Sequence, residues 1–267
     1  MSDQIIGLHE WFDTPPGRYL LAWERAQFDL AVADIFGFHA LQLGLTGLDA
    51  LQANRMPHKW RAGTGTGPGE AGGALVCDPA ALPFSEASLD LVTLPHALEL
   101  SPDPHATLRE VQRVLVPEGK AVICCLNPAS LWGLRQRRAH LYRRLGLGRL
   151  YLPDAGDFLG YWRIRDWLRL LGFEVETVEF GCYRPSVSTD KWFDRFEWMD
   201  AAGPRWWPIF GAAYMIVATK RVRGARILPG WKESPARAPA PVVAAASPSN
   251  ISSSNVKTRQ GPGGKTH

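Results

Sequence analysis

The sequence contains no apolar run of the roughly 20 residues that a membrane-spanning helix needs. Its beginning, MSDQIIGLHEW, lacks the basic segment followed by an apolar segment that is typical of a secretory signal. Cysteine is scarce, and no spacing among the four cysteines matches a metal-binding motif. We therefore expect a soluble cytoplasmic protein without a metal site, in which reduced thiols are contributed by Cys77, Cys124, Cys125 and Cys182.

Acidic residues are almost absent from the C-terminal segment. Residues 224–267 carry six basic side chains against Glu233 alone, which is a net charge of +5, whereas the whole chain carries +4. The remaining body is thus close to neutral, and the isoelectric point near 9.0 reflects this segment rather than a nucleic-acid-binding core. Because the segment is rich in Ala, Pro, Ser and Gly, we expect it to be disordered.

Two strands and a helix are evident in the middle of the chain. Residues 89–94 form an apolar run typical of a strand covered on both faces, and 120–126 form a second such run. Between them, apolar residues recur at helical spacing over 108–115, and a Pro-Glu-Gly sequence at 117–119 is expected to end the helix. A strand, a helix and a strand with short connections predict a parallel crossover in an α/β protein.

This region carries a family resemblance. The pattern Asp-x-x-x-Leu-Pro-Phe begins at Asp78, Ser-x-Asp-Leu-Val follows at Ser88, and Leu-Arg-Glu-Val-x-Arg-Val-Leu-x-Pro-x-Gly begins at Leu108. The block resembles the middle of class I S-adenosylmethionine-dependent methyltransferases of the type 11 group. The resemblance extends over about residues 39–220. It implies a Rossmann-like α/β fold with a mostly parallel seven-stranded sheet and helices on both faces.

The resemblance also suggests a division of the chain. Residues 1–38 would form an N-terminal helical cap, and 39–223 the methyltransferase-like domain. Within that domain, 131–161 would be an inserted basic helix and lid. The tail at 224–267, expected to be disordered from its composition, would follow the domain.

The first strand and the turn after it are expected at residues 39–45. By resemblance, the methionine part of S-adenosylmethionine would contact Gln42, Gly44, Thr46 and Gly47. Gln42 stands where the family has an acidic residue, Thr46 replaces the second glycine, and Gly47 falls one place early for the third. A glutamine can accept a hydrogen bond from the cofactor ammonium but brings no charge. We expect residues 46–56 to form a short helix with Thr46 as its cap.

Asp78 follows a short apolar segment at the carboxyl end of an expected strand, where open α/β sheets bind ligands. By resemblance its carboxylate would accept a hydrogen bond from the adenine amino group. Pro79 has no N–H, so Ala80 would supply the neighbouring contact, with Leu82 and Leu94 lining the same site. The alternative for Asp78 is a turn-forming Asp-Pro pair.

The family also uses an acid after the second strand to hold the ribose, and residues 58–62 lack one. Glu70 is the nearest substitute, within the glycine-rich loop 63–73. That loop is interpreted as a linker rather than a phosphate-binding turn, because it does not open into a helix.

His96 stands at the exit of the strand at 89–94, at the mouth of the expected site. It is the candidate catalytic residue because its pKa suits orienting or deprotonating an acceptor. A polar lining role is the alternative, and Glu99 has the same standing. The Leu-Pro-His-Ala sequence here differs from the Asn/Asp-Pro-Pro-Tyr motif of amino-group methylases, so DNA is not expected as a substrate.

A basic segment follows the second strand. Arginines recur from Arg135 to Arg149 with no acidic residue among them. This face can meet an anionic acceptor, RNA or a membrane surface, or it can simply be solvated. Four tryptophans occur late in the chain, and they can either line an apolar acceptor pocket or pack in the core: Trp192, Trp198, Trp206 and Trp207.

Taken together, the sequence predicts an S-adenosylmethionine-dependent methyltransferase with an unidentified small-molecule acceptor. The alternative is a catalytically silent, methyltransferase-like binding or scaffold protein, which the departures at Gln42 and Thr46 favour. A nicotinamide-dinucleotide enzyme is disfavoured, because no Gly-x-Gly-x-x-Gly turn follows a first strand.

Overall fold

The computed structural model describes residues 11–63, 74–144, 158–185 and 190–221, all within the compact unit Met1–Gly224. The predictions for Glu70, the loop 64–73, Arg149 and the tail from 224 onward lie outside the described residues. Within the described part, no helix is long and apolar enough to cross a membrane.

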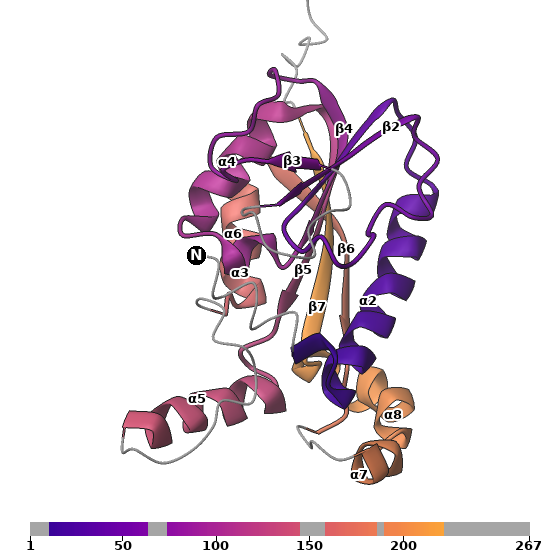
Figure 1. Cartoon of the computed structure of the whole chain (residues 1–267), viewed down its shortest axis with the longest axis vertical. Helices are drawn as coiled ribbons and strands as arrows, with labels where there is room; N and C mark the ends of the chain where they lie inside the picture. The colour runs from indigo at the N-terminus through magenta and orange to yellow at the C-terminus, as the bar shows by residue number, and fades with distance from the viewer. Residues whose placement is uncertain (1–10, 64–73, 145–157, 186–189, 222–267) are drawn as a thin grey trace, which may run out of the picture. The chain divides into compact units, whose positions relative to one another are not determined.

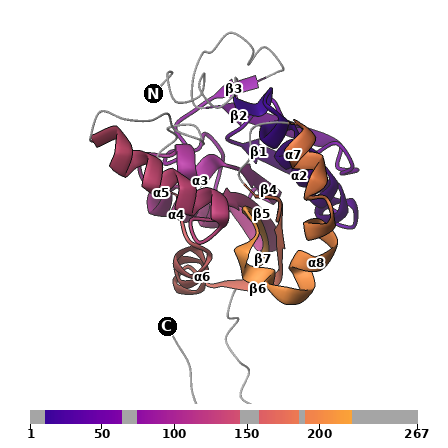
Figure 2. The same cartoon turned by 90° about the horizontal axis from the view of Figure 1, so that it is seen from below.

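A seven-stranded sheet forms the centre of the unit (Figure 1). Its strand order is β3-β2-β1-β4-β5-β7-β6 (Figure 2). Only β7 runs antiparallel to its neighbours, pairing with both β5 and β6. This confirms the predicted α/β fold with a mostly parallel sheet. The strands are β1 (His39–Leu43), β2 (His58–Gly63), β3 (Ala74–Val76), β4 (Leu89–Pro95), β5 (Leu115–Leu126), β6 (Phe173–Gly181) and β7 (Ala213–Lys220).

Helices cover both faces of this sheet. In Figure 2, α2, α7 and α8 lie on one side of the strands, and α3, α4 and α6 on the other. The described helices are α2 (Pro15–Ala33), α3 (Ala97–Leu100), α4 (Pro104–Val114), α5 (Leu131–Arg144), α6 (Tyr161–Leu170), α7 (Asp190–Arg195), α8 (Trp198–Trp206) and the short 3-10 helix η1 (Pro208–Phe210).

Two apolar cores result, one on each face. Alternate residues of β5 contribute to different cores, so that Cys124 packs on the side of α2 and Cys125 packs on the side of α4 and α6. This follows from the two-residue period of a strand, which points neighbouring side chains to opposite faces. Because both faces are covered, residues Ala121–Leu126 of β5 are buried without interruption.

The local sequence explains where helices α2 and α4 begin and which face of α2 is buried. Thr14 caps α2 by accepting a hydrogen bond from the Gly17 N–H, and two prolines occupy its first turn. Its buried face includes Leu20, Glu24 and Phe28 at four-residue spacing. On the other side of the sheet, Asp103 caps α4, whose last residue Val114 leads directly into β5.

Two local predictions were wrong. The helix expected over 46–56 is absent: residues 44–57 between β1 and β2 form turns. The Pro-Glu-Gly sequence at 117–119 does not end α4 but lies inside β5, where Glu118 takes a left-handed backbone conformation (φ 64°). In the first place the Gln42 side chain pairs with backbone groups of the turn, and in the second the chain continues as strand β5.

Candidate functional site

His96 lies at the carboxyl end of β4, at the edge of the sheet where ligands bind in open α/β folds. Its backbone is left-handed, with φ 53°, which is uncommon for a residue other than glycine. The His96 N–H donates to the Cys124 carbonyl oxygen at 2.9 Å, so the pairing of β4 with β5 continues past the end of β4. The imidazole is only 1% exposed, so the sharp turn directs the ring into the protein rather than into solvent.

Two buried carboxylates hold the imidazole. His96 Nε2 lies 2.7 Å from Glu24 Oε1 of α2, and His96 Nδ1 lies 2.6 Å from Glu99 Oε2 of α3. The second oxygen of Glu99 accepts a hydrogen bond from the Leu126 N–H at 2.7 Å, at the end of β5. The three side chains therefore connect an N-terminal helix to the centre of the sheet.

Burial and charge act in opposite directions on this cluster. Burial alone would lower the pKa of His96, but the carboxylates of Glu24 and Glu99 hold it well above its ordinary value. Burial raises the pKa of Glu99, against the opposing influence of His96 and the Leu126 N–H. Both ring nitrogens of His96 thus lie within hydrogen-bond distance of a carboxylate oxygen.

Glu24 has two further notable features. Its Oε1 atom also accepts a contact from Cys124 Sγ at 3.6 Å, and its Oε2 atom is buried without a hydrogen-bond partner among the described residues. Aromatic rings pack beside the cluster. The Phe12 ring centroid is 6.2 Å from that of His96, and Trp11 packs edge-on against Phe12 and Trp132. Glu24 and Glu99 are themselves 0% and 4% exposed, so the carboxylates are shielded from water.

Gln42 is placed at the carboxyl end of β1, as predicted, but its side chain is fully used by the protein. Its Nε2 atom donates to the carbonyl oxygens of Leu45 and Leu48, and its Oε1 atom accepts from the Ala50 N–H at 2.9 Å. The amide therefore binds the turn that follows β1. These contacts explain why 44–57 folds without a helix, since the Gln42 side chain pairs with the backbone groups of the turn.

The neighbouring turn residues differ in their surroundings. Gly44 has φ 111°, and a Cβ atom there would lie 2.6 Å from the Pro95 carbonyl oxygen, so only glycine allows this approach of the turn to β4. The Thr46 hydroxyl is buried and has no partner among the described residues, whereas Gly47 is exposed. Gly44 is thus required for packing, and Thr46 retains an unused polar atom.

On the other side of β1, Asp78 follows β3 and is exposed. Its Oδ1 atom accepts a hydrogen bond from the Ala80 N–H at 2.9 Å, which makes a tight turn. The predicted Asp-Pro turn is therefore present, and the Ala80 N–H is already engaged. Leu82 and Leu94 are 4% and 0% exposed and pack in the apolar core on the side of α4.

The structure thus separates the predicted residues into groups. Gln42 lies near the end of β1, Gly44 and Thr46 lie in the turn after it, His96 contacts α2 through Glu24, and Asp78 follows β3. Sequence analysis missed Glu24. The available signal was its position midway between Leu20 and Phe28 on the buried face of α2, where a carboxylate needs a partner.

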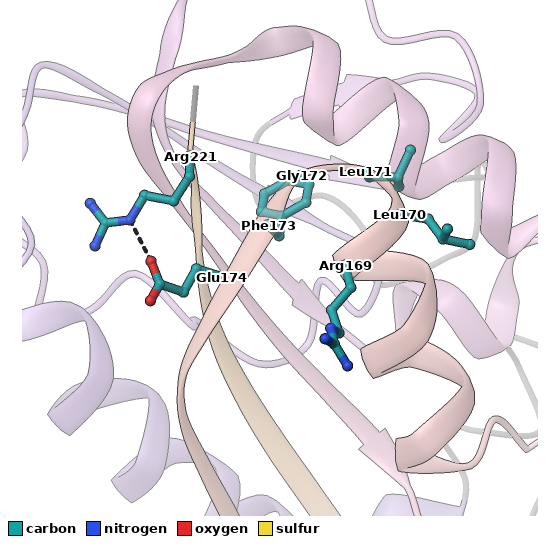
Figure 3. Close-up of a pocket in the computed structure, with 7 residues that line it drawn as sticks. All are labelled: Arg169, Leu170, Leu171, Gly172, Phe173, Glu174 and Arg221. Atoms are coloured by element: carbon teal, nitrogen blue, oxygen red, sulfur yellow. Dashed lines mark hydrogen bonds and ion pairs between the residues drawn. The ribbon is translucent and has the colours of Figure 1, made fainter. Parts of the chain in front are cut away.

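A separate hollow of about 590 Å³ lies between the end of α6 and the start of β6 (Figure 3). Glu174 and Arg221 form an ion pair at its rim, with Glu174 Oε2 2.7 Å from Arg221 Nε. Because β6 runs parallel to β4 and β5, the amino end of β6 is at the opposite edge of the sheet from His96. The hollow is therefore not part of the His96 cluster.

The sequence was compared with known protein families and with curated proteins. Residues 45–123 match the sequence model of a methyltransferase domain family. A curated relative, the uncharacterized protein YafS of Escherichia coli (strain K12), is 35% identical over 167 residues, which is 62% of this chain and 65% of that protein. The match therefore covers just under two thirds of the length of this relative.

Solved structures show the same architecture. A Thermotoga maritima protein described as a SAM-dependent methyltransferase and possible histamine N-methyltransferase has a TM-score of 0.54 at 16% identity, over 76% of this chain and 92% of that chain. A SAM-dependent methyltransferase from Archaeoglobus fulgidus has a TM-score of 0.52 at 16% identity, over 76% of this chain and 94% of that chain. At this identity the likeness concerns the fold.

S-adenosylmethionine is the cofactor that this domain implies, and the described residues fit it at two points. Asp78 offers an exposed carboxylate at the end of β3, of which only one oxygen is engaged by the turn. Thr46 offers a hydroxyl without a partner among the described residues, in the turn after β1. Gln42 offers no free polar atom in this arrangement.

The strand order, with β7 as the antiparallel member, agrees with the domain match over 45–123. Residues 45–123 thus match a methyltransferase domain family, and the described fold is similar to that of solved S-adenosylmethionine-dependent methyltransferases.

Proposed function

We propose that the protein transfers a methyl group from S-adenosylmethionine to a small-molecule acceptor at the carboxyl edge of β1, β3 and β4. The observation that carries this proposal is the strand order β3-β2-β1-β4-β5-β7-β6 together with the methyltransferase domain match. When bound, the cofactor supplies an electrophilic methyl group on sulfur, so that the protein needs mainly to align the acceptor and exclude water.

The polar groups of the edge receive separate roles in this proposal. Asp78 would accept a hydrogen bond from the adenine amino group, while its other oxygen keeps the turn with Ala80. Thr46 would bind a polar group at the methionine end through its unpaired hydroxyl. Gln42 would act indirectly, by holding the turn 45–50 in place.

His96 was the predicted catalytic residue, and that role stays a prediction. Both of its ring nitrogens contact carboxylates, and its side chain is 1% exposed, so direct contact with an acceptor would require one of these contacts to break. We propose instead that His96 positions the edge of β4 by fixing Glu24 and Glu99. This role needs no proton transfer to or from the acceptor.

An anionic acceptor is favoured by the start of α5. This helix follows the carboxyl end of β5, and the side chains of Arg135, Arg137 and Arg138 are exposed on it with no acidic residue in the first turn. Positive charge at the entrance of a site raises the local concentration of anions. RNA and a membrane surface are the other partners that such a face can meet. A reducing, cytoplasmic location is also proposed, since all four cysteines are free thiols.

Ligand-dependent stability tests the proposal directly. S-adenosylmethionine and S-adenosylhomocysteine should each raise the melting temperature of the purified chain, and NADH should not. A ligand present at one hundred times its Kd adds about 2.7 kcal/mol of stability. If neither sulfur compound shifts the melting temperature at millimolar concentration, the methyltransferase proposal fails.

Calorimetry on variants then tests the cofactor contacts. Asp78→Ala should weaken S-adenosylhomocysteine binding, whereas Asp166→Ala, an exposed aspartate on α6, should not. Asp78→Asn keeps an oxygen for the Ala80 turn and so separates loss of the carboxylate charge from loss of the turn. Unchanged affinity in both Asp78 variants would remove Asp78 from the site.

A second candidate function is supported by the engagement of Gln42. Because no polar atom of this side chain is left for a ligand, a catalytically silent binding protein is the alternative. Metabolite profiles of cells lacking the protein, complemented with either the wild type or Asp78→Ala, distinguish the two. A methylated product that depends on the wild type supports transfer, and identical profiles despite measured cofactor binding favour the silent protein.

A further inference from the structure

Three buried side chains from three separate elements converge beside the sheet. Glu24 comes from α2, His96 from the turn after β4, and Cys124 from β5, and one ligand atom of each lies within 4.8 Å of the others. All three side chains are at most 1% exposed. Glu24 and His96 are 72 positions apart in the sequence, and His96 and Cys124 are 28 apart, so the three residues do not form a short sequence motif.

The distances are close to those of a metal centre. His96 Nε2 is 2.7 Å and Cys124 Sγ is 3.6 Å from Glu24 Oε1. Zinc bonds of about 2.0–2.3 Å in a tetrahedron place neighbouring donor atoms roughly 3.3–3.8 Å apart. The sulfur–oxygen distance already falls in this range, and the nitrogen–oxygen distance needs to lengthen by about half an ångström, which a side-chain rotation provides.

An unpaired polar atom supplies independent support. Glu24 Oε2 is buried and has no hydrogen-bond partner among the described residues, although the side chain is 0% exposed. A buried carboxylate oxygen without a partner is costly, and a cation bound by this carboxylate removes that cost. The ion pair with His96 satisfies only the other oxygen.

The environment of His96 is also that of a metal ligand. Its Nδ1 atom is held by Glu99 Oε2 at 2.6 Å, which leaves Nε2 directed at Glu24 and Cys124. The Glu99 carboxylate is in turn fixed by the Leu126 N–H. A carboxylate behind the distal nitrogen is the usual support of a histidine that binds zinc, because it fixes the ring orientation and increases its basicity.

We propose that Glu24, His96 and Cys124 bind one zinc ion, each through one donor atom. A donor set of thiolate, imidazole and carboxylate suits zinc rather than magnesium or calcium, which take oxygen donors. On binding, the proton between Nε2 and Glu24 and the thiol proton of Cys124 leave to solvent. The closed surroundings favour a structural ion that fastens α2 to β4 and β5.

Metal binding to the full-length protein tests this assignment without any activity assay. Protein stripped with a chelator is titrated with zinc chloride in the presence of a chromophoric competitor, and then with cobalt chloride. We expect one ion per chain and, with cobalt, the near-ultraviolet absorption of a thiolate-to-metal charge transfer. Zinc should also raise the melting temperature of the stripped protein.

The chain offers a matched control for the sulfur ligand. Cys125 is the next residue of β5 and is equally buried, but it packs on the opposite face of the sheet. Cys124→Ala should remove the charge-transfer absorption and weaken zinc binding at least tenfold, whereas Cys125→Ala should preserve both. Glu24→Gln, which keeps the shape of the side chain, should also weaken binding at least tenfold and serves if Cys124→Ala does not fold.

Three outcomes would overturn the assignment. The first is a folded, stripped wild type that binds neither ion at micromolar concentration. The second is a Cys124→Ala or Glu24→Gln variant that binds as tightly as the wild type. The third is equal loss in Cys124→Ala and Cys125→Ala, since that would attribute the signal to general damage of β5. Circular dichroism of each variant establishes that it is folded.

Discussion

Glu24 and His96 are 72 residues apart in sequence, yet Glu24 Oε1 lies 2.7 Å from His96 Nε2 inside the protein. The contact joins the middle of α2 to the exit of β4. Because Glu99 holds the other ring nitrogen, the orientation of the imidazole is fixed from both sides. The N-terminal helix is therefore tied to the edge of the sheet that would bind the cofactor.

Removal of the Glu24 carboxylate should cost much stability. In metal-free protein, Glu24→Ala is expected to lower the free energy of unfolding by about 3–5 kcal/mol, because the buried His96 ring loses one of its two carboxylate partners. Urea denaturation measures the difference. Arg25→Ala, at the next and exposed position of α2, should stay within about 0.5 kcal/mol of the wild type. A Glu24→Ala variant as stable as this control would contradict the prediction.

The contacts of Gln42 predict that the family's acid is not tolerated at this position. Gln42→Glu has nearly the same size, but it replaces the Nε2 donor by an oxygen facing the carbonyl oxygens of Leu45 and Leu48. Leaving two carbonyls unpaired beside a buried charge should lower the unfolding free energy by at least about 3 kcal/mol. Chemical denaturation of the variant gives this value.

Gln52→Glu is the matched control, because Gln52 is exposed in the same connection between β1 and β2. It should leave stability nearly unchanged. If Gln42→Glu proved stable and bound S-adenosylmethionine more tightly than the wild type, Gln42 would be a cofactor ligand and its role in holding the turn would be secondary.

The fold was largely predictable because its strongest signals are local. The apolar run at β4, the helical spacing of α4 and the apolar run of β5 each occupy fewer than about a dozen neighbouring residues, and the resemblance supplied the mostly parallel seven-stranded sheet. The segment 46–56 was mispredicted as helical. Propensity favoured a helix there, but the side chain of Gln42, outside the segment, pairs with its backbone.

The site was only partly predictable because its decisive contacts are long-range. The position of His96 at the exit of β4 followed from the pattern of β4 itself. Its burial did not, since Glu24 and Phe12 come from the N-terminal segment and Cys124 from the next strand. A carboxylate on the buried face of α2 indicates that a partner exists, but nothing in the sequence identifies that partner as His96.

A carboxylate remote from this cluster predicts how stability depends on pH. The hydrogen bonds from Arg113 lower the pKa of Glu110, against the opposing effect of burial, with a smaller contribution from the Leu82 N–H. A folded-state pKa below the unfolded value stabilises the protein above about pH 4.5, and this contribution is lost as the pH falls through the folded-state pKa. The wild type should therefore exceed Glu110→Gln in stability at neutral pH and lose that advantage in acid.

The size of this effect is limited by exposure, since the side chains of Glu110 and Arg113 are 20% and 35% exposed. We expect a difference of about 1 kcal/mol or less at pH 7, measured by urea unfolding at several pH values. The exposed Glu179→Gln control should differ from the wild type by less than about 0.5 kcal/mol throughout. An advantage of the wild type that grows below pH 4.5 would have the wrong sign.

The turn after β1 should be intolerant of any side chain at Gly44. Gly44 has φ 111°, and a Cβ atom would lie 2.6 Å from the Pro95 oxygen and 2.8 Å from Ala97 Cα. Gly44→Ala should therefore lower the unfolding free energy by at least about 2 kcal/mol, through backbone strain and through displacement of the turn from β4. Urea denaturation measures this difference, provided that the unfolding free energy of both proteins falls with urea concentration at the same slope.

Gly160→Ala provides the comparison, because a Cβ atom at Gly160 would meet only the Pro128 side chain, at 3.7 Å, and its φ of −74° suits any residue. Its cost should stay below about 1 kcal/mol, the price of a weaker cap at the start of α6. Equal stability of Gly44→Ala and the wild type would mean that the turn can move away from Pro95. The Leu45 N–H, which donates to the Pro95 oxygen at 3.0 Å, would then be a replaceable contact rather than one that fixes the turn after β1.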